Sequence, residues 1–342
     1  MTEQSNPPDA GMEFVKMAGT PLAVSRIGLG TWAIGGWMWG GTDEAQSIRT
    51  IHEALDRGVT LFDTAPVYGF GRSEEILGKA LAEGGRRNRA VIATKVGLDW
   101  RGETPFRNGS RARIFKEVED SLRRLQTDVI DLYQVHWPDT NIPIAETAAA
   151  MADLHRAGKI RAVGVSNFSP AQMDEFRAVA PLHAVQPPYN LFERAIETDV
   201  LPYAARHRLA TLAYGSLCRG LLSGRMNDQT QFPGDDLRNS DPKFRAPRFQ
   251  QYLKAVQQLD RFARDNYGKR VIHLAARWVL DRADTNIALW GARRPDQLAP
   301  VSGVTGWKID QSAMREIDAI LTQNIASPVG PEFMAPSMNV AA

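Results

Sequence analysis

The chain has a single cysteine, almost no excess charge and no long apolar run. Of its 342 residues only Cys218 is a cysteine, which excludes an intramolecular disulfide and any zinc cluster built on cysteines. Lysine and arginine number 41 against 39 acidic residues, and a formal net charge of +2 is not typical of nucleic-acid-binding proteins. No stretch approaches the roughly 18 consecutive apolar residues of a membrane-spanning helix. We therefore predict neither a nucleic-acid partner nor a membrane partner.

The first residues, MTEQSNPPDAG, carry neither the basic flank nor the apolar core of a secretory signal. Together with the single cysteine, this start favours a cytoplasmic protein. We expect residues 1–11 to be a flexible tail and residues 12–342 to form one barrel domain. The sequence predicts no metal site and indicates no particular oligomeric state.

Short apolar runs alternate along the chain with longer amphipathic stretches. The apolar runs are rich in β-branched residues, as buried parallel strands are. They occupy residues 25–36, 59–65, 90–97, 129–137, 160–167, 183–190, 209–216 and 285–292. Helical patterns occupy residues 43–57, 73–82, 110–125, 143–157, 170–178, 194–207 and 251–282. Eight strands alternating with helices predict an α/β fold, a closed parallel (β/α)₈ TIM barrel rather than an open sheet.

Other segments stand outside this repeat. Residues 13–24 are expected to form an N-terminal hairpin that closes the bottom of the barrel, and residues 310–322 an extra C-terminal helix. Ser73 and Ser110 are expected to cap the N-termini of their helices. Residues 225–248 form a long polar loop after the seventh strand, and a loop of that length is usually functional.

Four reactive side chains fall at or just after three consecutive strand ends. Asp63 ends the second strand, with Tyr68 five residues further on, Lys95 ends the third strand and His136 the fourth. Each of them alone has an ordinary structural explanation, such as a turn, surface packing or a solvated amine. In a barrel, however, the C-terminal strand ends meet at one mouth, so the four side chains are predicted to converge.

This combination of side chains suits carbonyl reduction. A hydride that reaches a carbonyl carbon produces an alkoxide, which needs a proton, and Tyr68 is a weak acid with an ordinary pKa of about 10. We expect the neighbouring Lys95 ammonium to lower the pKa of Tyr68, and Asp63 to keep Lys95 charged. His136 is expected to donate to the carbonyl oxygen, a contact typically worth ~3–4 kcal/mol.

The sequence resembles the aldo-keto reductases from about residue 13 to about residue 322. LFDTAPVYGFGRSEEILGKAL resembles the family's first signature, and DLYQVHWPD, IRAVGVSNF, AVQPPYN and LAYGSLCRGLLSG resemble later ones in the same order. Within the family it is most similar to the long-chain bacterial branch of general-stress and polyol-related reductases. The resemblance implies a catalytic tetrad of Asp63, Tyr68, Lys95 and His136. It also implies NADP(H) held on a barrel without a Rossmann fold.

The resemblance also implies which residues hold the cofactor. For the nicotinamide end it implies Gly30, Thr31, Trp32, Ser166, Asn167, Gln186 and Tyr214. For the pyrophosphate it implies Gly215, Ser216, Leu217, Arg219, Gly220 and Arg225. For the adenosine phosphate it implies Gly291, Ala292, Arg293 and Gln297. Gly291 and Ala292 are expected to start a helix whose N-terminus holds phosphate, with Arg293 on the 2′-phosphate.

The adenosine segment departs from the family pattern. Leu289 and Trp290 precede Gly291 where many members have Ile-Pro. Pro300 and Val301 stand where many members carry the Glu-Asn pair that holds the adenine edge. Two interpretations follow: either the affinity for the cofactor is modest, or residues 225–248 help to hold the cofactor instead. The Arg293–Arg294 pair still favours NADP over NAD.

Tryptophans are concentrated near the predicted mouth. Trp32, Trp37 and Trp137 are predicted to line the substrate pocket, whereas Trp39 is taken as ordinary packing. The segment at residues 106–115 and the loop at 225–248 are expected to set substrate specificity.

The leading hypothesis is an NADPH-dependent reductase of small carbonyl compounds, reversible towards polyols of the glycerol–glyceraldehyde type. A cofactor-binding regulatory subunit with slow turnover, like the channel β-subunits related to this family, is the main alternative. A barrel enzyme that forms a Schiff base on Lys95 is a third reading.

Overall fold

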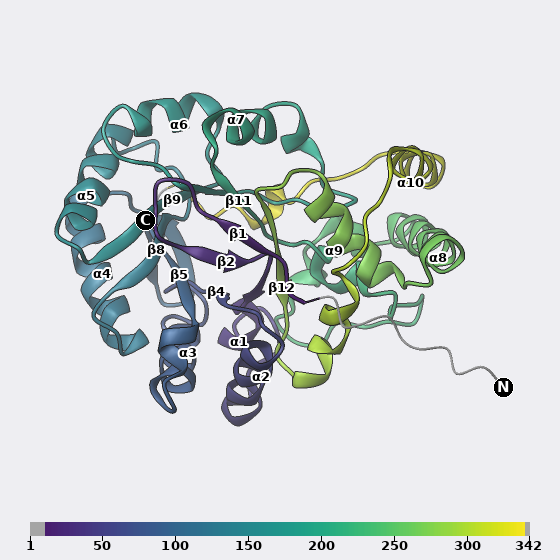
Figure 1. Ribbon diagram of the computed structural model, residues 1–342, viewed down its shortest axis with the longest axis horizontal. Coiled ribbons are helices and arrows are strands. Elements are labelled where there is room, and N and C mark those ends of the chain that lie inside the picture. Colours follow the sequence, from purple (N-terminus) through teal and green to yellow (C-terminus); the bar gives the residue numbers. More distant parts are fainter. Residues whose placement is uncertain (1–10, 339–342) are drawn as a thin grey trace.

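The computed structural model describes residues 11–338, within which eight parallel strands close into a barrel ringed by helices (Figure 1). The barrel strands are, in chain order, β3 (Ile27–Gly30), β4 (Leu61–Asp63), β5 (Val91–Val96), β8 (Ile130–Val135), β9 (Ile160–Ser166), β10 (Ala184–Gln186), β11 (Ala210–Ala213) and β12 (Asn286–Gly291). Each strand pairs with its neighbour in this order, and β12 pairs with β3 to close the ring. The predicted (β/α)₈ barrel is confirmed. The predicted tail at residues 1–11 lies outside the described residues except for Gly11.

Amphipathic helices cover the outside of the barrel. They are α2 (Glu44–Asp56), α3 (Arg72–Ala82), α4 (Arg111–Leu125), α5 (Ile144–Arg156), α6 (Pro170–Arg177), α7 (Val200–His207) and α9 (Val271–Asp281). The short α1 (Trp32–Gly35) follows the first barrel strand, and α8 (Arg248–Tyr267) and α10 (Gln311–Asn324) lie at the right of Figure 1. The helical pattern at residues 251–282 is two helices rather than one. Gly268, at φ +61°, ends α8 in a left-handed conformation that favours glycine.

Of the two predicted helix caps, Ser110 is confirmed and Ser73 is not. Ser110 caps α4, and its hydroxyl accepts from the Arg113 amide. The Ser73 prediction is wrong, because α3 already begins at Arg72, after Gly71. The buried Ser73 hydroxyl instead donates to the Thr31 carbonyl oxygen at 3.0 Å, and so ties the start of α3 to the end of β3.

The predicted N-terminal hairpin is present and closes one end of the barrel. Strands β1 (Phe14–Lys16) and β2 (Ala23–Ser25) are antiparallel, and Figure 1 shows them lying across the middle of the barrel. Met17, Leu22 and Val24 are buried in one cluster with the apolar residues that fill the barrel interior. This end lies at the beginnings of the strands, so the opposite mouth is left for polar side chains.

A second hairpin was not predicted. Strands β6 (Leu98–Arg101) and β7 (Thr104–Arg107) pair antiparallel directly after β5. Residues 106–115, expected to set substrate specificity, comprise the end of β7, a link of three residues and the start of α4. Strands of four residues with several polar side chains do not give a clear alternating pattern, which is why the sequence does not reveal them.

Short 3₁₀ helices occupy the segments around the mouth. They include η3 (Cys218–Ser223), η4 (Leu237–Asn239), η5 (Pro242–Phe244), η6 (Pro295–Gly303) and η7 (Glu332–Met334), with η1 (Arg86–Arg89) and η2 (Ala195–Glu197) elsewhere. After α10 the chain returns to the barrel, where Ser337 forms a parallel bridge with Phe106 of β7. Among residues 11–338, no helix has both the length and the apolar character needed to cross a membrane.

Candidate active site

The barrel mouth brings three of the predicted tetrad residues into direct contact. The Lys95 ammonium donates to Asp63 Oδ2 at 2.7 Å, to the Thr64 carbonyl oxygen at 2.9 Å and to Tyr68 Oη at 3.2 Å. Lys95 is fully buried on β5, and Asp63, the last residue of β4, is 3% exposed. A desolvated, paired ammonium therefore touches the phenol oxygen.

His136 lies at the same mouth, directly after β8. Its backbone amide donates to the Val96 carbonyl oxygen, and its ring lies edge-on to the Tyr68 ring at 5.9 Å between centroids. Burial and the nearby Lys95 charge hold the pKa of His136 well below its ordinary value. The imidazole is therefore neutral at neutral pH and retains one N–H donor.

Asp63 is held in place by two glutamines as well as by Lys95. Gln186 and Gln134 both donate to Asp63 Oδ1, at 2.7 and 3.3 Å. The sequence analysis missed Gln134. Its signal was a polar residue inside an apolar run, two positions before His136 and therefore on the same inward face of the strand.

Burial decides the pKa of Tyr68. The pKa is raised well above its ordinary value by desolvation first and by the Asp63 charge second. The expected lowering of the Tyr68 pKa by Lys95 is therefore wrong for this chain. Burial also lowers the pKa of Lys95, although Asp63 opposes that shift. The phenol consequently holds its proton throughout the neutral range.

Two cavities meet at this cluster. A cavity of about 230 Å³ runs between the ends of β3, β11 and β12, and a second, of about 340 Å³, opens beside His136. Among the described residues, both cavities are lined by Trp32, Tyr68, Tyr214 and Met334. Tyr68 therefore lies at the junction, where a molecule in one cavity would meet a molecule in the other.

A model of the aldo/keto reductase family matches residues 26–322 of the chain. The chain belongs to the aldo/keto reductase family. The resemblance found in the sequence is thus confirmed, and members of this family use nicotinamide cofactors.

Named relatives span nearly the same length as this aldo/keto reductase. Aldo-keto reductase YhdN of Bacillus subtilis (strain 168) is 62% identical over 325 residues, which cover 95% of this chain and 98% of the relative. The NADH-specific methylglyoxal reductase of Escherichia coli (strain K12) is 35% identical over 304 residues, 84% of this chain and 91% of the relative. The solved structure of the glycerol dehydrogenase AKR11B4 from Gluconobacter oxydans is 55% identical with a TM-score of 0.86, covering 94% of this chain and 99% of that one.

Most of the cofactor residues expected from the sequence line the 230 Å³ cavity of this aldo/keto reductase. They are Gly30, Thr31, Trp32, Tyr214, Gly215, Ser216, Leu217, Arg219, Gly220, Gly291, Ala292, Arg293 and Gln297. The 340 Å³ cavity is lined instead by Ser166, Asn167, Gln186, Trp37, Trp137 and His136. Arg225 lines neither cavity, and its side chain is half exposed near Asp296.

The residues expected to hold a carboxamide form a hydrogen-bonded group in the reductase. Ser166 Oγ donates to the Gln186 carbonyl oxygen, and Asn167 Nδ2 donates to the His136 carbonyl oxygen. Tyr214 Oη donates to Asn167 Oδ1 at 2.9 Å. Asn167 has a φ of +62°, an uncommon backbone conformation that tends to occur at functional sites.

The arginines that line the first cavity differ in whether a carboxylate neutralises their charge. Arg219 is buried against Glu193 and Asp241, so its charge is neutralised within the chain. Arg293 donates to the Trp39 carbonyl oxygen at 2.6 Å and forms no ion pair with any carboxylate of the described residues. Arg238 also lines the cavity, with its charge paired to Asp236, and was missed, since nothing in the 225–248 loop distinguishes it from the other basic residues there.

The segment after β12 does not form the helix that was expected to start at Gly291. Gly291 is the last residue of the strand, so Gly291 and Ala292 do not start a helix. The helical turn begins at Pro295, and Gln297 Oε1 accepts from the Arg293 and Arg294 amides at 2.9 and 3.1 Å. The Gln297 carboxamide therefore shapes the turn that presents Arg293.

The lining of the first cavity fits a dinucleotide. A Cβ added at Gly291 would meet no other atom within 4 Å, and one at Gly30 would meet only the Trp290 carbonyl oxygen, at 3.9 Å. Bare backbone thus faces open space, which lets phosphates and flat rings approach closely. Arg293, without a carboxylate partner among the described residues, supplies a cation suited to phosphate.

Proposed function

We propose that this chain reduces small aldehydes and ketones with NADPH, and in reverse oxidises small polyols, with Tyr68 as the general acid and base. The observation that carries the proposal is the contact of the Lys95 ammonium with both Asp63 and Tyr68 Oη, at the junction of two cavities. A nicotinamide cofactor, when bound, would supply or accept the hydride.

In reduction, Tyr68 donates its phenolic proton to the carbonyl oxygen of the substrate. Lys95 stabilises the phenolate that remains, because its ammonium already donates to that oxygen. Asp63 keeps Lys95 charged and correctly oriented. The neutral His136 donates a hydrogen bond to the same carbonyl oxygen and holds it for attack. In oxidation, the Tyr68 phenolate accepts the proton of the alcohol.

Residues from the linings of both cavities are proposed to hold the cofactor. Tyr214 would stack on the nicotinamide, with Ser166 and Asn167 near its carboxamide. Arg293 would bind a phosphate, and it is assigned to the 2′-phosphate that distinguishes NADPH from NADH. Because one relative is named for NADH, both cofactors belong in the test.

The lining of the 340 Å³ cavity favours neutral substrates. Its walls include Trp37, Trp137 and Leu98, and no charged side chain of the described residues lines it. We expect a polyol or aldehyde of a few carbons to bind between Tyr68 and these walls. The likeness to a glycerol dehydrogenase at 55% identity supports polyols of that size.

The Schiff-base reading is disfavoured by the site. Lys95 Nζ already donates to three oxygens and is fully buried, so its nitrogen offers no free lone pair to a carbonyl compound.

The test is cofactor consumption with a panel of aldehydes that includes glyceraldehyde, run in parallel with NADPH and NADH. We expect turnover with a preference for NADPH. Tight NADPH binding without turnover would instead support the regulatory-subunit alternative, and an equal rate with both cofactors would refute the role of Arg293.

A further inference from the structure

The hairpin of β6 and β7 forms one wall of the substrate cavity. Leu98, Thr104 and Pro105 of this hairpin line the cavity beside His136 and Trp137. A two-stranded hairpin with four-residue strands is marginally stable by itself. The position of this wall therefore depends on what anchors it.

Arg113, in the first turn of α4, contacts three consecutive residues of β6. Its Nε donates to the Leu98 carbonyl oxygen at 3.0 Å, and its Nη1 lies 3.2 Å from Asp99 Oδ1. Its guanidinium lies over the Trp100 ring, 5.1 Å from the centroid. Arg113 is only 8% exposed, so these contacts are made largely out of water. One planar side chain thus fixes the backbone, a carboxylate and an aromatic ring of the wall.

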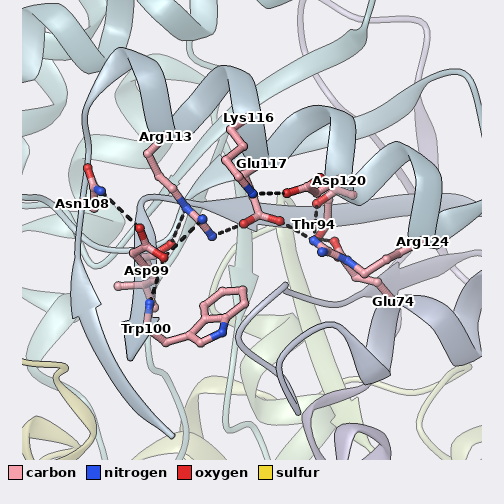
Figure 2. A network of polar contacts seen from close by, with 12 residues as sticks. Glu74, Thr94, Asp99, Trp100, Asn108, Arg113, Lys116, Glu117, Asp120 and Arg124 are labelled. Carbon is pink, nitrogen blue, oxygen red and sulfur yellow. Dashed lines mark hydrogen bonds and ion pairs between the residues drawn. The ribbon is translucent and has the colours of Figure 1, made fainter. Parts of the chain in front are cut away.

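The other side of Arg113 joins a network of buried ion pairs, drawn in Figure 2. Arg113 and Arg124 both form ion pairs with Glu117. Arg124 in turn lies 2.6 Å from the fully buried Glu74 of α3. The Thr94 hydroxyl donates to Glu74 at 2.6 Å, and Thr94 directly precedes Lys95 on β5. The network therefore ties the hairpin to the strand that carries Lys95.

A row of aromatic rings extends from Arg113 to the cavity. The Trp100 ring lies 5.6 Å from Phe70, and Phe70 lies 5.0 Å from Trp37, which lines the cavity. A shift of Trp100 would remove the support behind Trp37. The anchoring of β6 and the packing of an indole wall thus depend on the same guanidinium.

We infer that Arg113 is a specificity-positioning residue, which touches neither cofactor nor reacting atoms but sets the substrate cavity wall. The inference rests on the proposed function, since it concerns the cavity that would hold the carbonyl substrate. Substrates large enough to contact Leu98 and Trp37 need this wall in place. Substrates that reach only Tyr68 and His136 do not.

The test compares Arg113→Met with Arg123→Met, a matched control on the same helix. Arg123 also pairs with an acidic residue, Asp120, but its side chain is 71% exposed. For Arg113→Met we expect KM for benzaldehyde to rise about tenfold, KM for propanal to rise less than about threefold, and NADPH affinity to stay unchanged. Arg123→Met should leave all three values unchanged. A loss of kcat equal for both aldehydes, or unchanged KM values, would overturn the inference.

Two further variants separate positioning from a general loss of structure. Arg113→Lys keeps the charge but not the fork that reaches Leu98 and Asp99 together, so it should not restore the KM for benzaldehyde. Asp99→Asn removes the ion pair on the hairpin side without leaving a buried charge, and should raise the same KM by a smaller factor. If Arg113→Met does not fold, Asp99→Asn serves as the test variant in its place.

Amide hydrogen exchange over residues 98–107 tests the inference without relying on catalysis. We expect faster exchange there in Arg113→Met than in the wild type or Arg123→Met, with the strands β11 and β12, which the network does not reach, unchanged. If no aldehyde is reduced by the wild type, the proposed function fails, and this exchange still decides the anchoring role. Unchanged exchange over the hairpin would overturn that role.

Discussion

At the scale of single residues, the proposed chemistry depends on a phenol and an ammonium that are both removed from water. Burial favours the neutral form of each, which raises the pKa of Tyr68 and lowers that of Lys95. Asp63, held by Gln134 and Gln186, counteracts this effect for Lys95. The pair therefore has a proton to donate at neutral pH and a charge that stabilises the phenolate once the proton has left.

A pH dependence follows from the direction of these shifts. Reduction uses the protonated form of Tyr68, and because its pKa is raised, the rate of reduction should stay level across the neutral range. Oxidation uses the phenolate, whose fraction rises about tenfold per pH unit below the pKa, so its optimum should lie at higher pH. Because the pKa of His136 is lowered, its titration should add no inflection near pH 6.5 to the pH profile of either rate.

Initial rates in both directions, measured across a pH series at saturating cofactor, check this expectation. Coincident optima for reduction and oxidation would argue against Tyr68 as the acid and base.

The convergence of Asp63, Tyr68, Lys95 and His136 could be predicted from the sequence because a barrel brings consecutive strand ends together. The direction of the Tyr68 pKa could not, since it depends on burial by Trp32 and the other residues around the mouth. The Tyr68 ring stacks on Trp32 at 5.6 Å, and no local pattern reveals such a contact.

At the scale of elements, the barrel strands were predictable and the segments around the mouth were not. Eight apolar runs rich in β-branched residues specify the barrel strands. The hairpin β6–β7 and the C-terminal segment that carries Met334 lack such a pattern, because much of their surface remains in contact with water or with the cavity. The hairpin nevertheless forms a wall of the 340 Å³ cavity, and Met334 of the C-terminal segment lines both cavities.

The turn that follows β12 gives a prediction at this scale. Gln297 holds the amides of Arg293 and Arg294, and the Arg293 guanidinium binds the Trp39 carbonyl oxygen. In Arg293→Ala we expect the Kd for NADPH to rise about ten- to hundredfold and the Kd for NADH to rise much less, because only NADPH carries the 2′-phosphate.

Fluorescence titration with each cofactor measures this difference, and Arg294→Ala is the matched control. Arg294 already pairs with the exposed Asp296, so its loss should affect both cofactors little. Equal losses of both cofactors in Arg293→Ala would place the 2′-phosphate elsewhere.

At the scale of the whole molecule, a second buried ion cluster joins segments far apart in the sequence. Glu193, Arg219, Asp241 and Lys243 are all at most 8% exposed and come from the loop after β10, from η3 and from the 225–248 segment. Lys243 Nζ lies 2.8 Å from Glu193 and donates to the Gly330 carbonyl oxygen at 3.0 Å. The cluster therefore fastens the C-terminal segment to the rim of the barrel.

Removal of one charge from this cluster should destabilise the fold. Lys243→Met leaves two carboxylates facing one buried guanidinium, which typically costs ~3–5 kcal/mol in the free energy of unfolding. Lys116→Met, which removes an exposed ion pair with Asp120, is the control and should change that free energy little. Equilibrium unfolding in urea measures both, and equal midpoints for the two variants would contradict a structural role for the cluster.

The measurement that tests the central claim most directly is turnover and NADPH binding of Tyr68→Phe beside the wild type. The variant removes only the phenolic oxygen, and the ring still packs against Trp32. We expect the rate of carbonyl reduction to fall by about 10²–10⁴-fold while the Kd for NADPH remains nearly unchanged. Reduction by Tyr68→Phe at a rate near that of the wild type would contradict the account, because the proton would then come from another group.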